Sequence, residues 1–162
     1  MGIYEEIMQA CRKKAESLST CKKAQVGSVI LPTVGGQLIW DRCEDSIGVN
    51  WQERDKEEPW LPQRETFKPL QCGECCLCGK ALHAEVDASL RYKRKYWHLD
   101  KVDYLTLITT HHPCANCLHV VLPLGVTRLV IAHSKPNDPE DSAALYQALE
   151  EGLLEEVRFV QI

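Results

Sequence analysis

The distribution of cysteine constrains this chain more than any other feature of its sequence. Of its nine cysteines, four lie between residues 72 and 78 and two more at residues 114 and 117. A small secreted domain held by disulfides carries an even number of cysteines that are spread along the chain. Closely spaced thiols indicate instead a bound metal, with zinc the expected ion, in a protein kept in a reducing compartment.

Length and composition favour one globular domain. The chain has 162 residues, of which 44% are hydrophobic and 26% are charged, and these values are typical of a protein that folds without cross-links. We expect a single domain over residues 1–162, with a cysteine-rich insertion at about residues 51–79. The net charge of −4 excludes a generally basic coat for nucleic acid.

The sequence predicts neither a membrane span nor a secretory signal. No apolar run approaches the roughly 18 residues that a membrane helix needs. The first residues, MGIYEEIMQACRKK, contain early acids and no apolar signal core. We therefore expect a cytoplasmic protein with no membrane partner.

Hydrophobic periodicity predicts helices and strands that alternate along the second half of the chain. Alternation of this kind is typical of parallel strands covered on both faces. The sequence thus predicts an α/β fold, a three-layer α/β/α sandwich with a mixed five-stranded sheet. Helices are expected at residues 3–18, 81–95, 114–122 and 139–151, and strands at 25–31, 37–40 (resuming near 47–50), 102–109, 126–132 and 157–160. Pro32 with Gly35 and Gly36 predicts a hairpin turn, and Pro123 with Gly125 predicts a helix end.

Two short motifs carry residues suited to metal chemistry. The first is His83-Ala84-Glu85 and the second is Pro113-Cys114-Ala115-Asn116-Cys117. One neutral imidazole and two thiolates bind zinc and leave its fourth tetrahedral position for water. Cys114 and Cys117 are three positions apart, so they share one face of a first helical turn, where the helix N-terminus favours thiolates. We expect both motifs to open helices that follow neighbouring strands.

Glu85 is the nearest candidate for the proton shuttle that a zinc-activated water needs. Residues 83 and 85 lie about 200° apart around a helix. The side chains of His83 and Glu85 can therefore converge only if the metal lies beyond the helix end. The alternative is a closed structural site, in which His111 or His112 supplies a fourth ligand and no catalysis occurs.

The two motifs together, H-x-E followed by P-C-x-x-C, form a signature of zinc nucleobase deaminases. On these residues the chain resembles the cytidine and deoxycytidylate deaminase superfamily, and within it the deoxycytidylate deaminases. Residues 26–30 (VGSVI) are similar to their V-G-A-V-I, residues 48–50 (GVN) to their G-Y-N, and residues 107–117 (LITTHHPCANC) to their V-T-x-x-P-C-x-x-C. The resemblance covers residues 19–50 and 81–132.

This resemblance implies a cytidine deaminase-like fold and a small-molecule nucleotide substrate. The implied reaction is the zinc-dependent deamination of dCMP to dUMP with release of ammonia, in a homo-oligomer. Glu85 would be the catalytic residue, moving protons between water, base and leaving ammonia. Asn50 would hold the sugar, and Ala84 would also bind substrate. The implied zinc ligands are His83, Cys114 and Cys117.

Other substrates and roles stay open at the level of sequence. The base could be cytidine, a modified cytosine, guanine or adenosine in tRNA, and the chain could also be a non-catalytic, zinc-stabilised interaction module. The run RYKRKYW at residues 91–97 mixes cations with aromatic rings, which contact polynucleotides by charge and stacking. The plainer interpretation is a solvated helix end whose cations interact favourably with the helix dipole.

The first cysteine cluster predicts a second, structural zinc. Cys72, Cys75 and Cys78 are each three positions apart, a spacing that lets them share one ion. The fourth ligand would be Cys21, Cys43 or a histidine. The resemblance favours Cys21, because some deoxycytidylate deaminases have a cysteine and a second zinc in the matching region. A reduced cysteine loop without metal is the competing interpretation.

Overall fold

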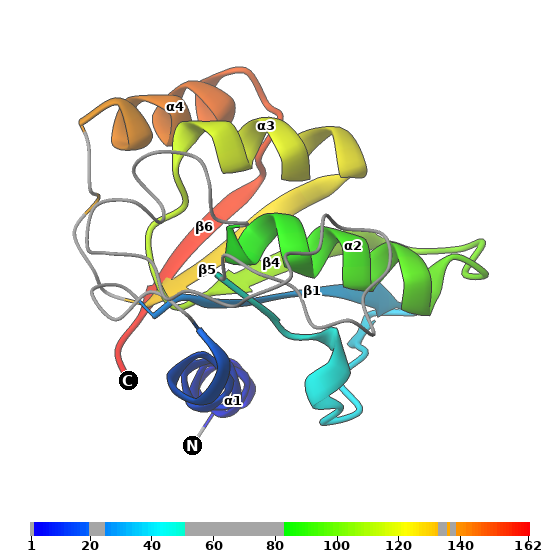
Figure 1. The fold of residues 1–162 in the computed structure, drawn as a ribbon. Helices are drawn as coiled ribbons and strands as arrows, with labels where there is room; N and C mark the ends of the chain where they lie inside the picture. The colour runs from blue at the N-terminus through cyan, green and yellow to red at the C-terminus, as the bar shows by residue number, and fades with distance from the viewer. Residues whose placement is uncertain (1, 20–24, 51–82, 133–135, 137–138) are drawn as a thin grey trace, which may run out of the picture.

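The fold is a sheet with helices on both faces (Figure 1). The computed structural model describes residues 2–19, 25–50, 83–132, 136 and 139–162. The cysteine-rich insertion predicted at about residues 51–79 therefore lies outside the described residues. None of the described helices is long and apolar enough to cross a membrane.

The described strands form one mixed sheet. They are β1 (Gly27–Val34), β2 (Gln37–Leu38), β3 (Gly48–Val49), β4 (Tyr104–Thr109), β5 (Val126–Ala132) and β6 (Glu156–Val160). Their spatial order is β2-β1-β4-β5-β6, and β3 pairs with the beginning of β1. The long strand β1 is antiparallel to β4, whereas β4, β5 and β6 run parallel. The predicted five-stranded order is confirmed, and the predicted return strand is divided into two short pieces, β2 and β3.

The helices make the outer layers of the predicted three-layer sandwich, which is confirmed. They are α1 (Ile3–Leu18), α2 (Ala84–Tyr96), α3 (Ala115–Leu124) and α4 (Pro139–Glu150), with a short 3₁₀ turn at Glu44–Ser46. Figure 1 shows α1 alone below the sheet and the other three helices above it. Each helix therefore buries its apolar face against the sheet or a neighbouring helix.

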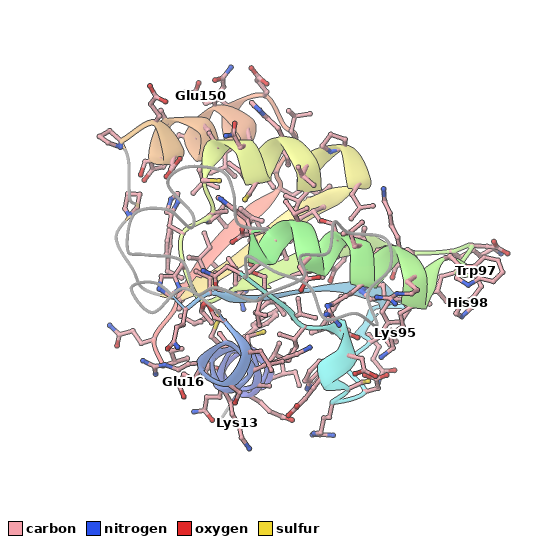
Figure 2. The ribbon with its side chains drawn as sticks, in the orientation of Figure 1. Lys13, Glu16, Lys95, Trp97, His98 and Glu150 are labelled. Carbon is pink, nitrogen blue, oxygen red and sulfur yellow. The ribbon has the colours of Figure 1, made fainter. Side chains whose placement is uncertain are left out.

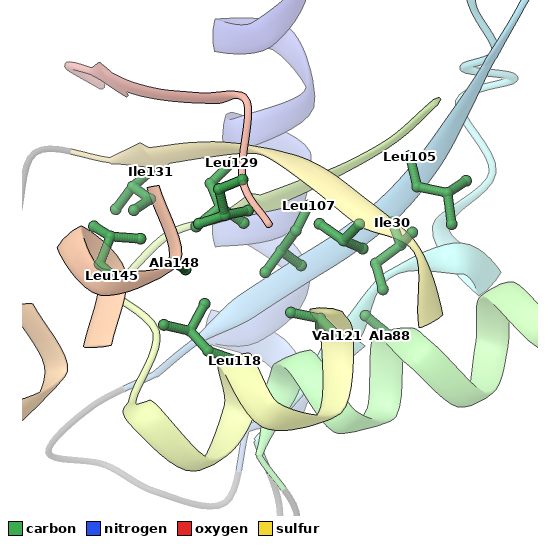
Figure 3. Packing of buried hydrophobic residues seen from close by; sticks show 12 residues of the cluster. Ile30, Ala88, Leu105, Leu107, Leu118, Val121, Leu129, Ile131, Leu145 and Ala148 are labelled. Atoms are coloured by element: carbon green, nitrogen blue, oxygen red, sulfur yellow. The ribbon is translucent and has the colours of Figure 1, made fainter. Parts of the chain in front are cut away.

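Two apolar clusters, one on each face of the sheet, hold the layers together. Successive side chains of a strand point to opposite faces. In β1, Ile30 consequently joins the cluster under α2, α3 and α4, while Val29 and Leu31 join the cluster under α1. Figure 3 shows the first cluster, with Leu118 of α3 among its members.

Two glycines allow helices to lie directly on strands. A Cβ atom at Gly27 would collide with the backbone of Cys11 in α1. One at Gly48 would collide with the backbone of α2 at Ala84 and Ala88. Gly48 therefore lets the first turn of α2 rest on β3, and this contact fixes the start of α2 relative to the sheet.

Two prolines lie inside elements that the sequence predicts to end there. Strand β1 continues through Pro32 to Val34. The carbonyl of Pro32 accepts a hydrogen bond from the N–H of Ile39, so the proline nitrogen faces the segment just past the end of β2, beyond the Thr33–Leu38 pair. The missing N–H of Pro32 thus costs no bond to β4.

Helix α3 likewise includes Pro123 and ends only at Leu124. A proline in the last turn removes a single helical hydrogen bond. Gly125, at φ 110°, then closes the helix by donating its N–H to the carbonyls of Leu122 and Val121. The left-handed conformation that Gly125 adopts is the usual form of such a helix end.

Candidate metal centre

His83 occupies the N-cap of α2 and is not part of the helix. Its backbone is extended, with φ −74° and ψ 150°, and Ala84 is the first helical residue. The imidazole can therefore reach forward from the helix end while Glu85 projects from the first turn. This resolves the 200° separation that helical spacing alone would impose on His83 and Glu85.

Cys114 has the same relation to α3. Its backbone is extended, with φ −75° and ψ 161°, and its sulfur accepts the N–H of Cys117 as a helix cap at 3.4 Å. Both motifs thus open helices, as predicted. The prediction that these helices follow neighbouring strands is wrong. They follow β3 and β4, and β1 lies between these two strands and pairs with both.

The three expected ligand atoms converge at the N-termini of α2 and α3. His83 Nδ1 lies 3.1 Å from Cys117 Sγ and 3.5 Å from Cys114 Sγ, and the two sulfurs are 3.2 Å apart. Zinc bonds of about 2.0 Å to nitrogen and 2.3 Å to sulfur at tetrahedral angles separate neighbouring donors by roughly 3.5–3.8 Å. The donors need to move apart only slightly, so this set of one imidazole and two thiols fits zinc. The prediction that His83, Cys114 and Cys117 converge is confirmed.

The hydrogen bond between the thiols of Cys114 and Cys117 shifts their pKa values in opposite directions. The hydrogen bond with Cys117 lowers the pKa of Cys114 to about 4, and the neighbouring His83 adds to this effect. The same hydrogen bond, together with burial, raises the pKa of Cys117. Cys114 therefore loses its proton more readily than Cys117, and a metal that binds here displaces the protons that the two thiols still hold.

Neither histidine of the closed-site alternative joins the ligand cluster. Among the described residues, the group that could hold a metal contains His83, Cys114 and Cys117 alone. The Nδ1 atom of His111 lies 2.9 Å from Thr110 Oγ1, and that of His112 lies 3.0 Å from the carbonyl oxygen of Pro113. Within the described part of the chain the centre thus has three protein ligands, the number typical of catalytic zinc.

Glu85 lies beside the ligands and is 4% exposed. Its Oε1 atom accepts a hydrogen bond of 3.3 Å from the hydroxyl of Thr109 at the end of β4. Burial raises the pKa of the Glu85 carboxyl, while hydrogen bonding to the Cys117 side chain opposes this shift. A carboxyl group whose pKa is raised holds a proton more readily than a free one, which suits a group that must both accept and release a proton.

Asn50 and Ala84 are both buried. The side-chain oxygen of Asn50 accepts hydrogen bonds from the N–H of Val26 at 2.8 Å and from the hydroxyl of Ser19 at 2.6 Å. These two donors tie the end of β3 to the approach of β1 and to the end of α1, and they fix the plane of the amide. Ala84 opens α2 directly after the ligand His83.

Asp141 belongs to the surroundings of the centre but was not singled out from the sequence. It lies in the first turn of α4, yet its Oδ1 accepts the N–H of Ala115 at 2.9 Å. Ala115 is the first residue of α3 and follows the ligand Cys114. An acidic residue in the first turn of a helix is expected to interact favourably with the dipole of that same helix. The nearby sequence therefore does not indicate that Asp141 contacts α3.

We expect Asp141→Ala to destabilise the protein and loosen its metal. Loss of a buried cap costs about 1–2 kcal/mol, and it releases the backbone next to Cys114. Asp141→Asn keeps an acceptor oxygen and is the matched control. Thermal unfolding and zinc loss to a chelator measure the two effects. Equal behaviour of the alanine and asparagine variants would contradict this role for the hydrogen bond.

The predicted second zinc site involves Cys21, Cys72, Cys75 and Cys78, which all lie outside the described residues. Cys43, the alternative ligand, is half-buried near the 3₁₀ turn. The second zinc therefore stays a prediction.

The basic and aromatic run at residues 91–97 covers the second half of α2 and its end. Arg91 pairs with Asp87 at 3.2 Å, and Lys95 pairs with Asp41 at 2.6 Å. Figure 2 places Lys95 at the end of α2, close to Trp97, which is 80% exposed. Because local acids balance these two cations, the arrangement favours the structural interpretation of the run over polynucleotide binding.

A three-layer α/β/α fold in which two helix N-termini bring one imidazole and two thiols together beside a buried carboxylate has the arrangement of the zinc-dependent nucleobase deaminases. The profile of one such family, the cytidine and deoxycytidylate deaminase zinc-binding region, matches residues 1–133. The chain therefore belongs to the cytidine and deoxycytidylate deaminase family, and zinc is its cofactor.

Solved structures agree with the fold. The dCMP deaminase of cyanophage S-TIM5 in complex with dCMP and dUMP has a TM-score of 0.62 and 20% identity, over 98% of this chain and 96% of that one. The same enzyme in apo form has a TM-score of 0.56 and 23% identity, over 99% and 100% of the two chains. A mutant of NE0047 in complex with 8-azaguanine has a TM-score of 0.52 and 16% identity, over 98% and 74%. Among curated proteins, no sequence matches this chain.

Proposed function

We propose that the protein deaminates a cytosine nucleotide, with dCMP converted to dUMP and ammonia. The observation that carries this proposal is the convergence of His83, Cys114 and Cys117 beside the buried carboxyl group of Glu85 in a chain of this family. Zinc held by these ligands supplies a Lewis acid that lowers the pKa of a water molecule toward about 7.

In the proposed reaction Glu85 carries the protons. Its carboxylate takes a proton from the attacking water and delivers it to N3 of the base as the water oxygen bonds to C4. The carboxylate then takes the second water proton and gives it to the amino nitrogen, and the C4–N bond breaks. The products are a uracil ring and ammonia, and Glu85 ends in its starting state. The burial of Glu85 supports this role, because it lets one carboxyl group act as both base and acid.

We propose that Asn50 and Ala84 bind the substrate. The side-chain oxygen of Asn50 is held by Val26 and Ser19, so its amide has one orientation in which to meet the sugar. The N–H of Ala84 belongs to the first helical turn, whose N–H groups lack partners within the helix, and it would donate to the base.

A substrate panel tests this proposal. We expect kcat/KM to be highest for dCMP, and higher than for deoxycytidine by about tenfold or more, because one hydrogen bond to a charged group contributes that much. Cytidine, CMP, guanine and adenosine complete the panel, with absorbance change and ammonia release as the measurements. Preference for guanine or adenosine would reject the cytosine substrate. Zinc-loaded protein that releases no ammonia from any compound would favour the non-catalytic module.

The proposal extends to organisation and location. We propose that residues 1–162 form one domain that assembles into a homo-oligomer in the cytoplasm. Exposed apolar side chains such as Tyr146 and Phe159 support assembly, since such groups gain from burial at an interface. Free thiols at Cys11, Cys114 and Cys117 fit a reducing compartment.

A further inference from the structure

Two buried hydroxyl groups on the sheet face α2 beneath the metal centre. Ser28 of β1 and Thr109 of β4 are cross-strand partners. Ser28 is two positions from Ile30 and Thr109 is two positions from Leu107, so both side chains point to the face of the sheet that packs under α2 and α3. Both residues are fully buried, at 0% exposed.

These hydroxyls form a chain of hydrogen bonds that ends on Glu85. Ser28 Oγ donates to Thr109 Oγ1 at 2.7 Å, and Thr109 Oγ1 donates to Glu85 Oε1 at 3.3 Å. A hydroxyl group has one proton to donate. Because Thr109 accepts from Ser28, its own proton is directed at the carboxyl group, and the chain has a single direction.

The chain has a consequence for the geometry of Glu85. A carboxyl group turns broadly about its last side-chain bond, and an anchor on Oε1 limits that rotation. The second oxygen is restricted with it, in a carboxyl group that also hydrogen-bonds to the side chain of the ligand Cys117. Proton transfer requires the transferring atom within hydrogen-bond reach of the reacting group, so this restriction acts directly on the step assigned to Glu85.

We propose that Ser28 and Thr109 are positioning residues for the deamination, and that they hold Oε1 of Glu85 so that the other oxygen carries the proton. Neither residue touches the substrate or the metal in this role. The inference rests on the proposed function, because it requires Glu85 to be the proton carrier.

Thr109→Val tests the inference, because valine keeps the shape of threonine and removes its hydroxyl. With dCMP we expect kcat to fall by about 10-fold to 100-fold, the effect of a misplaced catalytic group, while KM and zinc content stay unchanged. Thr109→Ser keeps the hydroxyl and should restore most of the lost kcat. Binding of a dCMP analogue with a tetrahedral C4 should weaken in parallel with kcat/KM, since it uses the same geometry without turnover.

A double-mutant cycle sharpens the test. Ser28→Ala should lower kcat less than Thr109→Val, and the double variant should match Thr109→Val alone, because Ser28 acts only through Thr109. Thr106→Val is the matched control. Thr106 lies on the same strand and is also buried, but its side chain points to the opposite face of the sheet, toward α1. Its hydroxyl has no hydrogen-bond partner among the described residues. It should keep the wild-type kcat.

Several outcomes would overturn the inference. They are an unchanged kcat in Thr109→Val, a rise in KM alone, and an equal loss of kcat in Thr106→Val. If Thr109→Val does not fold, Ser28→Ala decides, and an unchanged kcat in that variant rejects the chain. Turnover retained by Glu85→Gln would instead reject the role of Glu85, and with it the mechanism proposed above, so the two failures are distinguishable.

Discussion

Glu85→Gln is expected to keep zinc and to lose nearly all turnover. General acid–base catalysis contributes about 10²-fold to 10⁴-fold, and glutamine can neither accept nor release the proton. The ligand cluster of His83, Cys114 and Cys117 does not include Glu85, so the metal should remain bound. Ammonia release with dCMP and metal analysis of the same sample measure the two properties together.

The loss of activity in Glu85→Gln should not come from unfolding. Burial raises the pKa of Glu85 in the folded state. At any pH above the pKa of this residue in the unfolded state, Glu85 therefore lowers the free energy of unfolding, because folding must either bury its charge or add a proton to it. A neutral amide removes this cost, and the metal-free variant should be at least as stable as the metal-free wild type. Glu150→Gln, an exposed change on α4, is the control and should behave as wild type in both assays. Unchanged turnover in Glu85→Gln would remove this residue from the mechanism.

The layered fold and the metal ligands were predictable because each depends on local pattern. The apolar run within residues 126–132 predicts β5 with its observed bounds, since a strand buried on both faces has a nearly continuous run of apolar residues. The spacing of Cys114 and Cys117 predicts their shared helical turn. His83 could be joined to them by the motif, even though the sequence left its angle to Glu85 unsettled.

The errors at prolines have a common physical origin. Proline acts on one hydrogen bond, and its effect depends on which side of the strand or which turn of the helix that bond belongs to. At Pro32 the affected side faces Ile39, just past the end of β2, and not the long strand β4, and at Pro123 the helix is already ending. Neither fact is visible before the pairing and the helix end are known, so the sequence placed both element ends too early.

The residues around Glu85 and Cys114 could not be found from local sequence for a different reason. Thr109 contacts Glu85 across 24 positions, and Asp141 contacts Ala115 across 26. Each contact joins two elements whose relative position depends on the whole sheet. The first turn of α2 in turn depends on Gly48, which lets the helix touch β3. Local pattern therefore predicts the ligands of the centre, while their supports require the tertiary structure.

Cys117→Ala is expected to abolish both zinc binding at this centre and activity. Cys117 is the most central ligand, since its sulfur lies 3.1 Å from His83 Nδ1 and 3.2 Å from Cys114 Sγ. Two remaining donors are fewer than the three that hold zinc in catalytic sites, so zinc content should fall by one ion per chain. Ammonia release should become undetectable at the same time.

The matched thiol control for Cys117→Ala is Cys11→Ala. Cys11 is buried in α1, and burial raises its pKa to about 12, so its thiol stays protonated and binds no metal. Removing it should cost some stability through the lost apolar contact while zinc content and turnover stay at wild-type values below the melting temperature. An activity that survives in Cys117→Ala, or a zinc content equal to that of Cys11→Ala, would contradict the three-ligand centre. A fall by one ion with others still bound would locate the remaining metal elsewhere in the chain, where the first cysteine cluster, at residues 72–78, predicts it.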